Sequence, residues 1–284
     1  MLNESITQLE RLLRLHPGAE WLEQAQQRLD AAEDLVSELT LLSAMARRKL
    51  GKQRLSNQPC LLQSPAGTLD IAAWSNGDAG RVLLILYAIR LERLATPDLV
   101  TRLYRLGDAD ERAVIVSALA LFGSGEALRN LALDCGRSNS LALFAALAVH
   151  NPYPSRFYTE HEFNQLVLKA LFIGVSIEGV QGLMERVNPE LSRMCEDYLE
   201  ERLAAGREFP ADIWLALWPF ASPEGERRLL EYASGVDPRQ RYNAILALRN
   251  SLVAKPESAQ LLAGLREREQ DPQLRKLIGQ SMQY

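Results

Sequence analysis

The chain has 284 residues, of which 47% are hydrophobic and 24% charged, enough apolar material for one or two compact domains. Its net charge of −4 argues against nucleic acid as the main partner, because phosphate binding normally needs a basic surplus. Cys60, Cys135 and Cys195 lie far apart in sequence, which argues against disulfides or a zinc knuckle and predicts small buried apolar residues.

Targeting and membrane segments are not expected. Met1–Ser5 lacks the basic stretch and apolar run of a secretory signal. The longest apolar runs, Val82–Ile89 and Leu141–Val149, are far shorter than the ~20 residues that cross a bilayer. We therefore expect a cytoplasmic protein without a membrane span.

The first 58 residues are expected to form an N-terminal helical hairpin. Leu9–Leu13 predicts a short helix that ends at His16–Gly18. In Leu22–Leu50, apolar residues recur every three or four positions, which predicts a long helical segment with a heptad-like seam. This seam either packs on the rest of the chain, as an intramolecular hairpin, or joins two copies in a homodimer.

The next segment is expected to change from loop to helix. Prolines and a glycine interrupt residues 51–70, which predicts a loop. Helical spacing resumes near Leu69 and continues across a break at Asn76-Gly77 to Leu94. Because few segments of the chain alternate apolar and polar residues, we expect an all-α protein.

A short motif recurs before three predicted helices. It consists of an aspartate and, four positions later, an arginine, as in Asp108/Arg112, Asp237/Arg241 and Asp271/Arg275. The aspartate can accept the free N–H groups of a helix start, and the small residues that follow let helices approach closely. The last two copies are 34 residues apart, a plausible repeat period. The motif resembles HEAT-like repeats and predicts a right-handed stack of helical hairpins, an α-solenoid. We expect three parts: the N-terminal hairpin at 1–58, a helical domain at 59–220, and C-terminal HEAT-like repeats at 221–284 packed on the same solenoid.

Two sequence patterns are candidates for a cofactor-binding or metal-binding site. Phe122–Gly125 contains a Gly-x-Gly, but a helical pattern precedes it, so it is interpreted as a turn between helices. Two acidic pairs, one helical turn apart, are predicted to share one face: Glu196, Asp197, Glu200 and Glu201. They either bind magnesium or form a solvated face, in which Arg193 pairs with Asp197. We assign no catalytic residue, metal ligand or cofactor from these patterns.

Residues 150–215 depart from the plain hairpin pattern. His150–Pro154 is expected to be extended, because residues that precede proline avoid the α conformation. Asn164 and Lys169 interrupt an otherwise apolar helix, and each needs a partner if buried, since an unpaired polar group costs on the order of several kcal/mol. Further polar residues follow between Arg186 and Arg207. This polar cluster around the apolar helix either stabilises the fold or forms the floor of a small-molecule pocket.

The same stretch resembles the EboA family, whose members are named metabolite traffic proteins. The resemblance covers roughly residues 70–220 and rests on Arg81–Leu84, Cys135–Asn139, His150–Pro154, Phe163–Phe172, Asn188–Leu191, Ala204–Arg207 and Asp212–Trp214. It implies a bacterial biosynthetic gene cluster that also encodes a prenyltransferase, a hydrolase and a sugar-phosphate cyclase. The implied role is to help a secondary metabolite or its precursor reach the periplasm, and it assigns no catalytic residue.

Three hypotheses follow. The first is a non-catalytic adaptor or carrier, whose partners are a small metabolite or proteins of the same cluster. Its candidate binding residues are Arg137, Asn139, Asn151, Tyr153, Asn164, Lys169, Arg186, Asn188, Arg207 and Trp214. Their positive balance suits an anionic or polar ligand. The second is a magnesium-dependent enzyme acting on a prenylated or sugar-phosphate intermediate, and the third is a structural scaffold. A carrier should gather the basic and amide side chains in one cavity, whereas the enzyme needs the carboxylates there.

Overall fold

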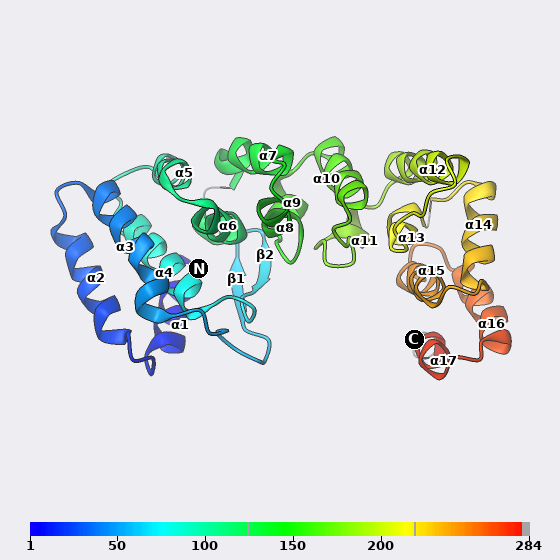
Figure 1. The fold of residues 1–284 in the computed structure, drawn as a ribbon, viewed down its shortest axis with the longest axis horizontal. Coiled ribbons are helices and arrows are strands. Elements are labelled where there is room, and N and C mark those ends of the chain that lie inside the picture. The colour runs from blue at the N-terminus through cyan, green and yellow to red at the C-terminus, as the bar shows by residue number, and fades with distance from the viewer. Residues whose placement is uncertain (124, 219, 280–284) are drawn as a thin grey trace. The chain divides into compact units, whose positions relative to one another are not determined.

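The structure, a computed structural model, describes residues 1–123, 125–218 and 220–279. These residues are mainly α-helical, which confirms the expected all-α class, apart from one two-stranded hairpin (Figure 1). The chain divides into two compact units, Met1–Thr159 and Glu160–Tyr284, and each is described by itself. The domain boundaries expected from the sequence remain predictions.

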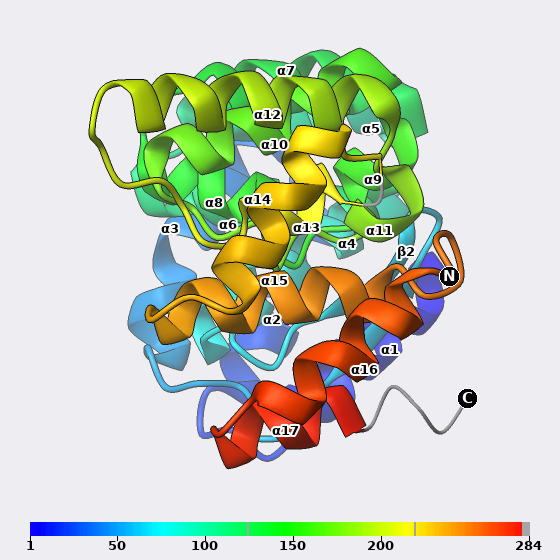
Figure 2. The ribbon, with the colours of Figure 1, turned by 90° about the vertical axis from the view of Figure 1, so that its right-hand side faces the viewer.

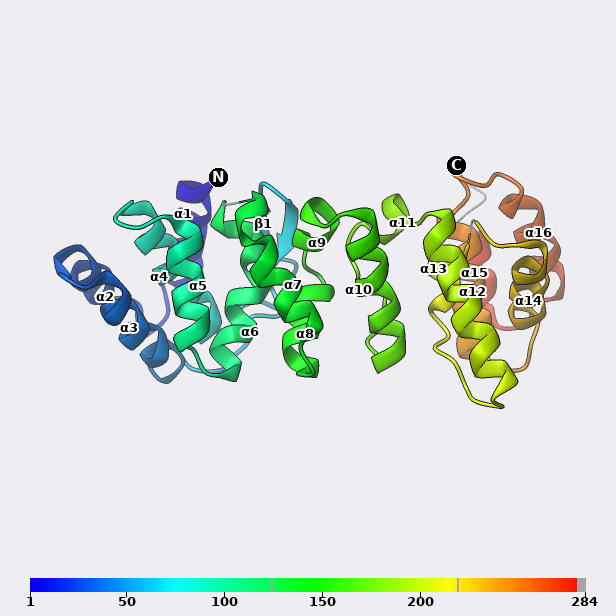
Figure 3. The ribbon, with the colours of Figure 1, turned by 90° about the horizontal axis from the view of Figure 1, so that it is seen from above.

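Unit 1 contains nine α-helices among its described residues, two strands and two short 3-10 helices. They are α1 (Leu2–Leu13), α2 (Ala19–Ala31), α3 (Leu35–Leu50), β1 (Leu61–Ser64), β2 (Gly67–Asp70), α4 (Asn76–Arg90), α5 (Thr96–Leu106), α6 (Ala109–Ser117), the 3-10 helices Leu119–Phe122 and Gly125–Leu128, α7 (Arg129–Arg137), α8 (Leu141–Ala148) and α9 (Tyr153–Phe157). Helices α5 and α7 form a layer over α6 and α8, as Figures 1 and 3 show.

Unit 2 contains eight α-helices in its described part. They are α10 (Glu160–Ile173), α11 (Leu183–Arg186), α12 (Pro189–Ala204), α13 (Ile213–Leu217), α14 (Pro223–Ala233), α15 (Pro238–Asn250), α16 (Ser258–Arg268) and α17 (Pro272–Gly279). Helix α15 packs against α13, α14, α16 and α17 (Figure 2). None of the helices in the described ranges has both the length and the apolar character that crossing a bilayer requires.

The N-terminal seam is not one continuous helix. It breaks between α2 and α3, because Asp34 accepts hydrogen bonds from the N–H groups of Val36 and Ser37, at 3.1 and 3.2 Å, and so starts a new helix. Both helices pack against α4, and Leu29 and Leu39 are fully buried within the chain. The seam therefore contributes to the core of unit 1, while the homodimer stays a prediction.

Two glycines allow α3 and α4 to approach closely. A Cβ on Gly77 would lie 2.7 Å from the Cα of Arg47 and 2.9 Å from the carbonyl oxygen of Gly51. A Cβ on Gly80 would overlap the side chain of Leu50. Because the atoms around Gly77 belong to the backbone, the two helices can relieve such a contact only by moving apart.

We expect Gly77→Ala to lower the free energy of unfolding by about 1–3 kcal/mol, the usual cost of overpacking. Gly264→Ala on α16 is the matched control, since a Cβ there meets open space. It should be neutral or stabilise the protein by up to about 1 kcal/mol through higher helix propensity. Urea unfolding of both variants tests this, and an equal effect of the two substitutions would contradict the close approach.

The expected loop at residues 51–70 contains a β-hairpin. Strands β1 and β2 pair antiparallel, with Leu62 opposite Leu69, and both leucines are buried. The prediction that a helix resumes near Leu69 is therefore wrong about where that helix begins. Helix α4 begins at Asn76, where Ser75 and Asp78 cap each other's backbone N–H groups, at 3.1 and 3.2 Å. Asn76-Gly77 is thus the beginning of a helix and not a break.

The recurring aspartates act as predicted. Asp108, Asp237 and Asp271 each accept a backbone N–H of their helix's first turn, at 2.8, 2.8 and 2.7 Å. Arg112 and Arg241 donate to carbonyl oxygens at or just beyond the end of the preceding helix, at 3.0 Å in both cases. In these two copies the motif joins the start of one helix to the end of the previous one.

The three cysteines are free and buried, as the sequence predicts. Burial raises the pKa of the Cys135 thiol to about 11 and raises the pKa of Cys195 further. Both thiols are therefore neutral near pH 7 and act as small apolar core residues.

Candidate functional site

The ten candidate binding residues are distributed over both units. Unit 1 holds Arg137, Asn139, Asn151 and Tyr153, and unit 2 holds Asn164, Lys169, Arg186, Asn188, Arg207 and Trp214. Their burial and partners divide them into side chains that hold the fold and side chains that face solvent.

Asn151 and Tyr153 stabilise the turn between α8 and α9. The Asn151 amide donates to the carbonyl oxygens of Val116 and Ala146, at 3.0 Å each, and its oxygen accepts the Tyr153 N–H. The Tyr153 hydroxyl donates to the Gly125 carbonyl oxygen at 2.7 Å, and burial raises its pKa. Both side chains are at most 2% exposed, so their polar atoms serve the fold.

The expectation of an extended His150–Pro154 segment is wrong, because α9 begins at Tyr153. Pro154 occupies its first turn, where proline costs no hydrogen bond, and His150 turns the chain with a φ of +55°. Arg137 and Asn139 are exposed, and Arg137 forms a surface ion pair with Asp134 at 3.6 Å.

Asn164 and Asn188 form a reciprocal amide pair between α10 and the start of α12. Asn164 donates to Asn188 at 3.2 Å, and Asn188 donates to Asn164 at 2.9 Å. The Asn188 oxygen also accepts the Leu191 N–H and caps α12. Asn164 is 1% exposed, so this pair is the partner that its burial requires.

Arg186 and Trp214 also contribute to packing. The Arg186 guanidinium lies 4.4 Å from the ring centre of Phe163, and burial lowers its pKa. Trp214 is fully buried, donates from Nε1 to the Gln240 side-chain oxygen at 2.9 Å and packs edge-on against Phe209. Arg207, by contrast, is exposed.

Lys169 lines a surface cavity. An open hollow of about 470 Å³ lies between α10 and α12, which we call the α10–α12 hollow. Its lining residues are Gln165, Leu168, Lys169 and Phe172 on α10, and Met194, Asp197, Tyr198 and Glu201 on α12. Partial burial lowers the pKa of the Lys169 ammonium. The sequence analysis missed most of this set, although the spacing of three and four within each helix was visible.

The acidic residues of α12 do not share one face. Glu196 accepts the Ser222 N–H at 2.6 Å, and Glu200 pairs with Arg228 at 2.7 Å. Asp197 and Glu201 line the hollow on another side of the helix. The expectation of a common face is wrong because neighbouring positions are rotated by about 100° around a helix. Within the described ranges, no three His, Cys, Asp or Glu side chains lie where they could hold a metal ion.

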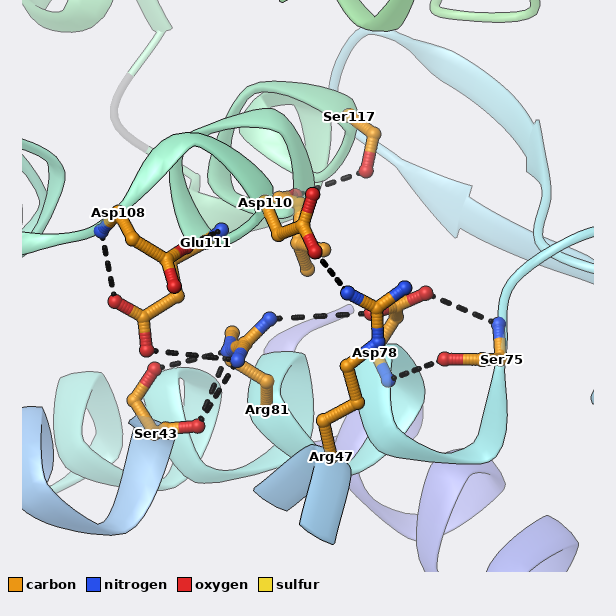
Figure 4. A network of polar contacts seen from close by, with 10 residues as sticks. Ser43, Arg47, Ser75, Asp78, Arg81, Asp108, Asp110, Glu111 and Ser117 are labelled. Atoms are coloured by element: carbon orange, nitrogen blue, oxygen red, sulfur yellow. Dashed lines mark hydrogen bonds and ion pairs between the residues drawn. The ribbon is translucent and has the colours of Figure 1, made fainter. Parts of the chain in front are cut away.

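Unit 1 also contains a buried ion-pair network that the sequence analysis missed (Figure 4). Arg81 on α4 is 2% exposed and donates to the backbone and side-chain oxygens of Ser43 on α3, at 3.2 and 3.0 Å. It also pairs with Glu111 on α6 at 3.5 Å and lies 3.8 Å from Asp78. The available signal was a charged residue directly before the apolar run Val82–Ile89, at a position where α4 is buried. The network ties three helices together.

The two units define a helical protein with packed polar clusters, and a hollow of small-molecule size lies between α10 and α12 in unit 2. The family model described as "Metabolite traffic protein EboA" matches residues 7–218, well over half of the chain. The protein therefore belongs to the EboA family, as the resemblance predicted. Neither a curated protein nor a solved structure gave a match.

Proposed function

We propose that this protein is a non-catalytic carrier or adaptor in the biosynthesis or traffic of a bacterial secondary metabolite. The family match over residues 7–218 carries this proposal, and the α10–α12 hollow, which lies wholly within the matched range, supports it. The protein acts in the cytoplasm as a HEAT-like stack of hairpins, with a small metabolite or proteins of the same gene cluster as partners.

The α10–α12 hollow is the binding site in this proposal. Its volume of about 470 Å³ falls within the usual range of small-molecule sites, and apolar side chains with a few polar groups line it. The Asn164–Asn188 pair holds α10 against the start of α12 from outside the hollow. Lys169 therefore belongs to the binding surface, while the two asparagines position its walls.

Gln165→Trp tests the site without a change of charge, because Gln165 is exposed on α10 and lines the hollow. Wild-type protein purified gently from its native host should release a small molecule, detected by mass spectrometry. The indole should fill the hollow and reduce the released amount at least about tenfold, equivalent to about 1.4 kcal/mol of lost binding. Gln165→Ala, which leaves the hollow open, should retain the molecule.

Equal release from wild type and Gln165→Trp would show that the molecule binds elsewhere. If wild type releases no small molecule, the carrier role fails. An adaptor role would then be supported if a protein encoded in the same cluster co-purifies with wild type. A variant changed on the exposed surface should no longer co-purify with that protein.

A further inference from the structure

Two aromatic rings from different helices flank the α10–α12 hollow. The ring centres of Phe172 on α10 and Tyr198 on α12 are 6.5 Å apart, with an angle of 59° between the ring planes. Phe172 is 73% exposed, an unusual state for so large an apolar side chain, and both residues line the hollow. The faces of such rings carry negative electrostatic potential and attract cations.

The net charge of the residues lining the hollow has the same sign as the electrostatic potential of the ring faces. Asp197 and Glu201 line it one turn apart on α12, and Lys169 is the basic residue among its lining side chains. Arg193 pairs with Asp197 at 2.6 Å and with Glu190 at 2.8 Å. Among the lining residues themselves, two carboxylates and one ammonium give a net formal charge of −1.

We propose that the α10–α12 hollow binds an organic cation, an ammonium or amidinium group on an apolar body. The cationic group lies over the faces of Phe172 and Tyr198, near Glu201, and the apolar body packs against Leu168 and Met194. This inference rests on the proposed carrier function and names the chemistry of its ligand. The sequence predicted an anionic or polar ligand, and this inference departs from the anionic alternative, because Lys169 lines the hollow, whereas Arg137 and Arg207 lie exposed outside it.

Three probes of similar shape and different charge test this inference on the full chain. They are choline, the neutral 3,3-dimethylbutan-1-ol and the anionic 3,3-dimethylbutanoate, titrated while the methyl NMR signal of Met194 is followed. Choline should bind about four- to 25-fold more tightly than the alcohol, since each of the two rings contributes about two- to fivefold through its interaction with a cation. The carboxylate should bind most weakly.

Variants separate the ring and charge contributions. Phe172→Leu keeps an apolar side chain but removes the π face, so it should weaken choline about threefold and leave the alcohol unchanged. Glu201→Gln should weaken choline, and Lys169→Gln should strengthen it. Both charge effects should shrink with added salt, because exposed charges are screened. Glu185→Gln, an exposed change outside the hollow, should alter nothing.

Tighter binding of the carboxylate than of choline would overturn the inference in favour of an anion site. Weaker choline binding by Lys169→Gln would also overturn it, since removal of a like charge should strengthen cation binding. Equal binding of all three probes would reduce the hollow to an apolar site, and no binding of any of them would also overturn the inference. These outcomes decide only which ligand charge the hollow prefers. Failure of the carrier function is recognised separately, by the absence of a released small molecule in the comparison with Gln165→Trp.

Discussion

Replacing Arg81 with methionine is expected to lower the free energy of unfolding by about 3–5 kcal/mol, the usual cost of removing one partner from a buried ion pair. Methionine fills much of the same volume, so the loss reports the charge and its hydrogen bonds. Glu111 would remain 8% exposed without its cation, and the Ser43 oxygens would lose their donor.

Urea unfolding with hydrogen exchange in residues 76–117 locates this effect in unit 1. The double variant Arg81→Met/Glu111→Gln should recover part of the loss, because it no longer buries an uncompensated carboxylate. Arg193→Ala serves as the control for an exposed arginine with two carboxylate partners and should cost far less, because water screens exposed ion pairs. A loss of similar size for Arg81→Met would show that the network contributes little.

Trp214→Ala is expected to destabilise unit 2 by about 3–5 kcal/mol, the range for removing a large buried aromatic side chain. Trp214 is fully buried beside Phe209 and Tyr232, and its removal leaves a cavity and an unpaired Gln240 oxygen. Trp214→Phe keeps most of the ring and should cost only about 1–3 kcal/mol, mainly through the lost hydrogen bond.

Urea unfolding measures the loss of stability, and hydrogen exchange in α13 and α15 locates it in unit 2. The same variants also distinguish packing from ligand binding at this candidate residue. If Trp214→Phe preserves stability but abolishes release of a bound small molecule, Trp214 belongs to the binding site and the packing interpretation is wrong.

Local features of the fold could be predicted from the sequence because their causes lie within a few residues. The aspartate caps of α6, α15 and α17 are examples, since an aspartate beside free N–H groups needs no distant partner. It could also be predicted that a buried Asn164 needs a hydrogen-bond partner, although the sequence did not identify that partner. The break at Asp34 was missed because the apolar spacing continues across it, and spacing alone does not distinguish one helix from two.

Features that depend on distant segments could not be predicted in the same way. Strands β1 and β2 are four residues each, too short for an alternating pattern to stand out, and their burial depends on the rest of unit 1. Phe172 and Tyr198 each fit an ordinary amphipathic helix. Only the packing of α10 beside α12 brings their rings to the same hollow, and no local pattern states which helices will be neighbours.

The Asn164–Asn188 pair has a consequence for how a ligand is bound. Two amides that exchange hydrogen bonds accept one alignment, since sliding α10 along α12 would leave the buried Asn164 amide without its Asn188 partner. The spacing of the two helices is therefore set before any ligand arrives. Binding then requires little ordering of the backbone, so the entropic cost of association is small and the empty and occupied hollow should have nearly the same shape.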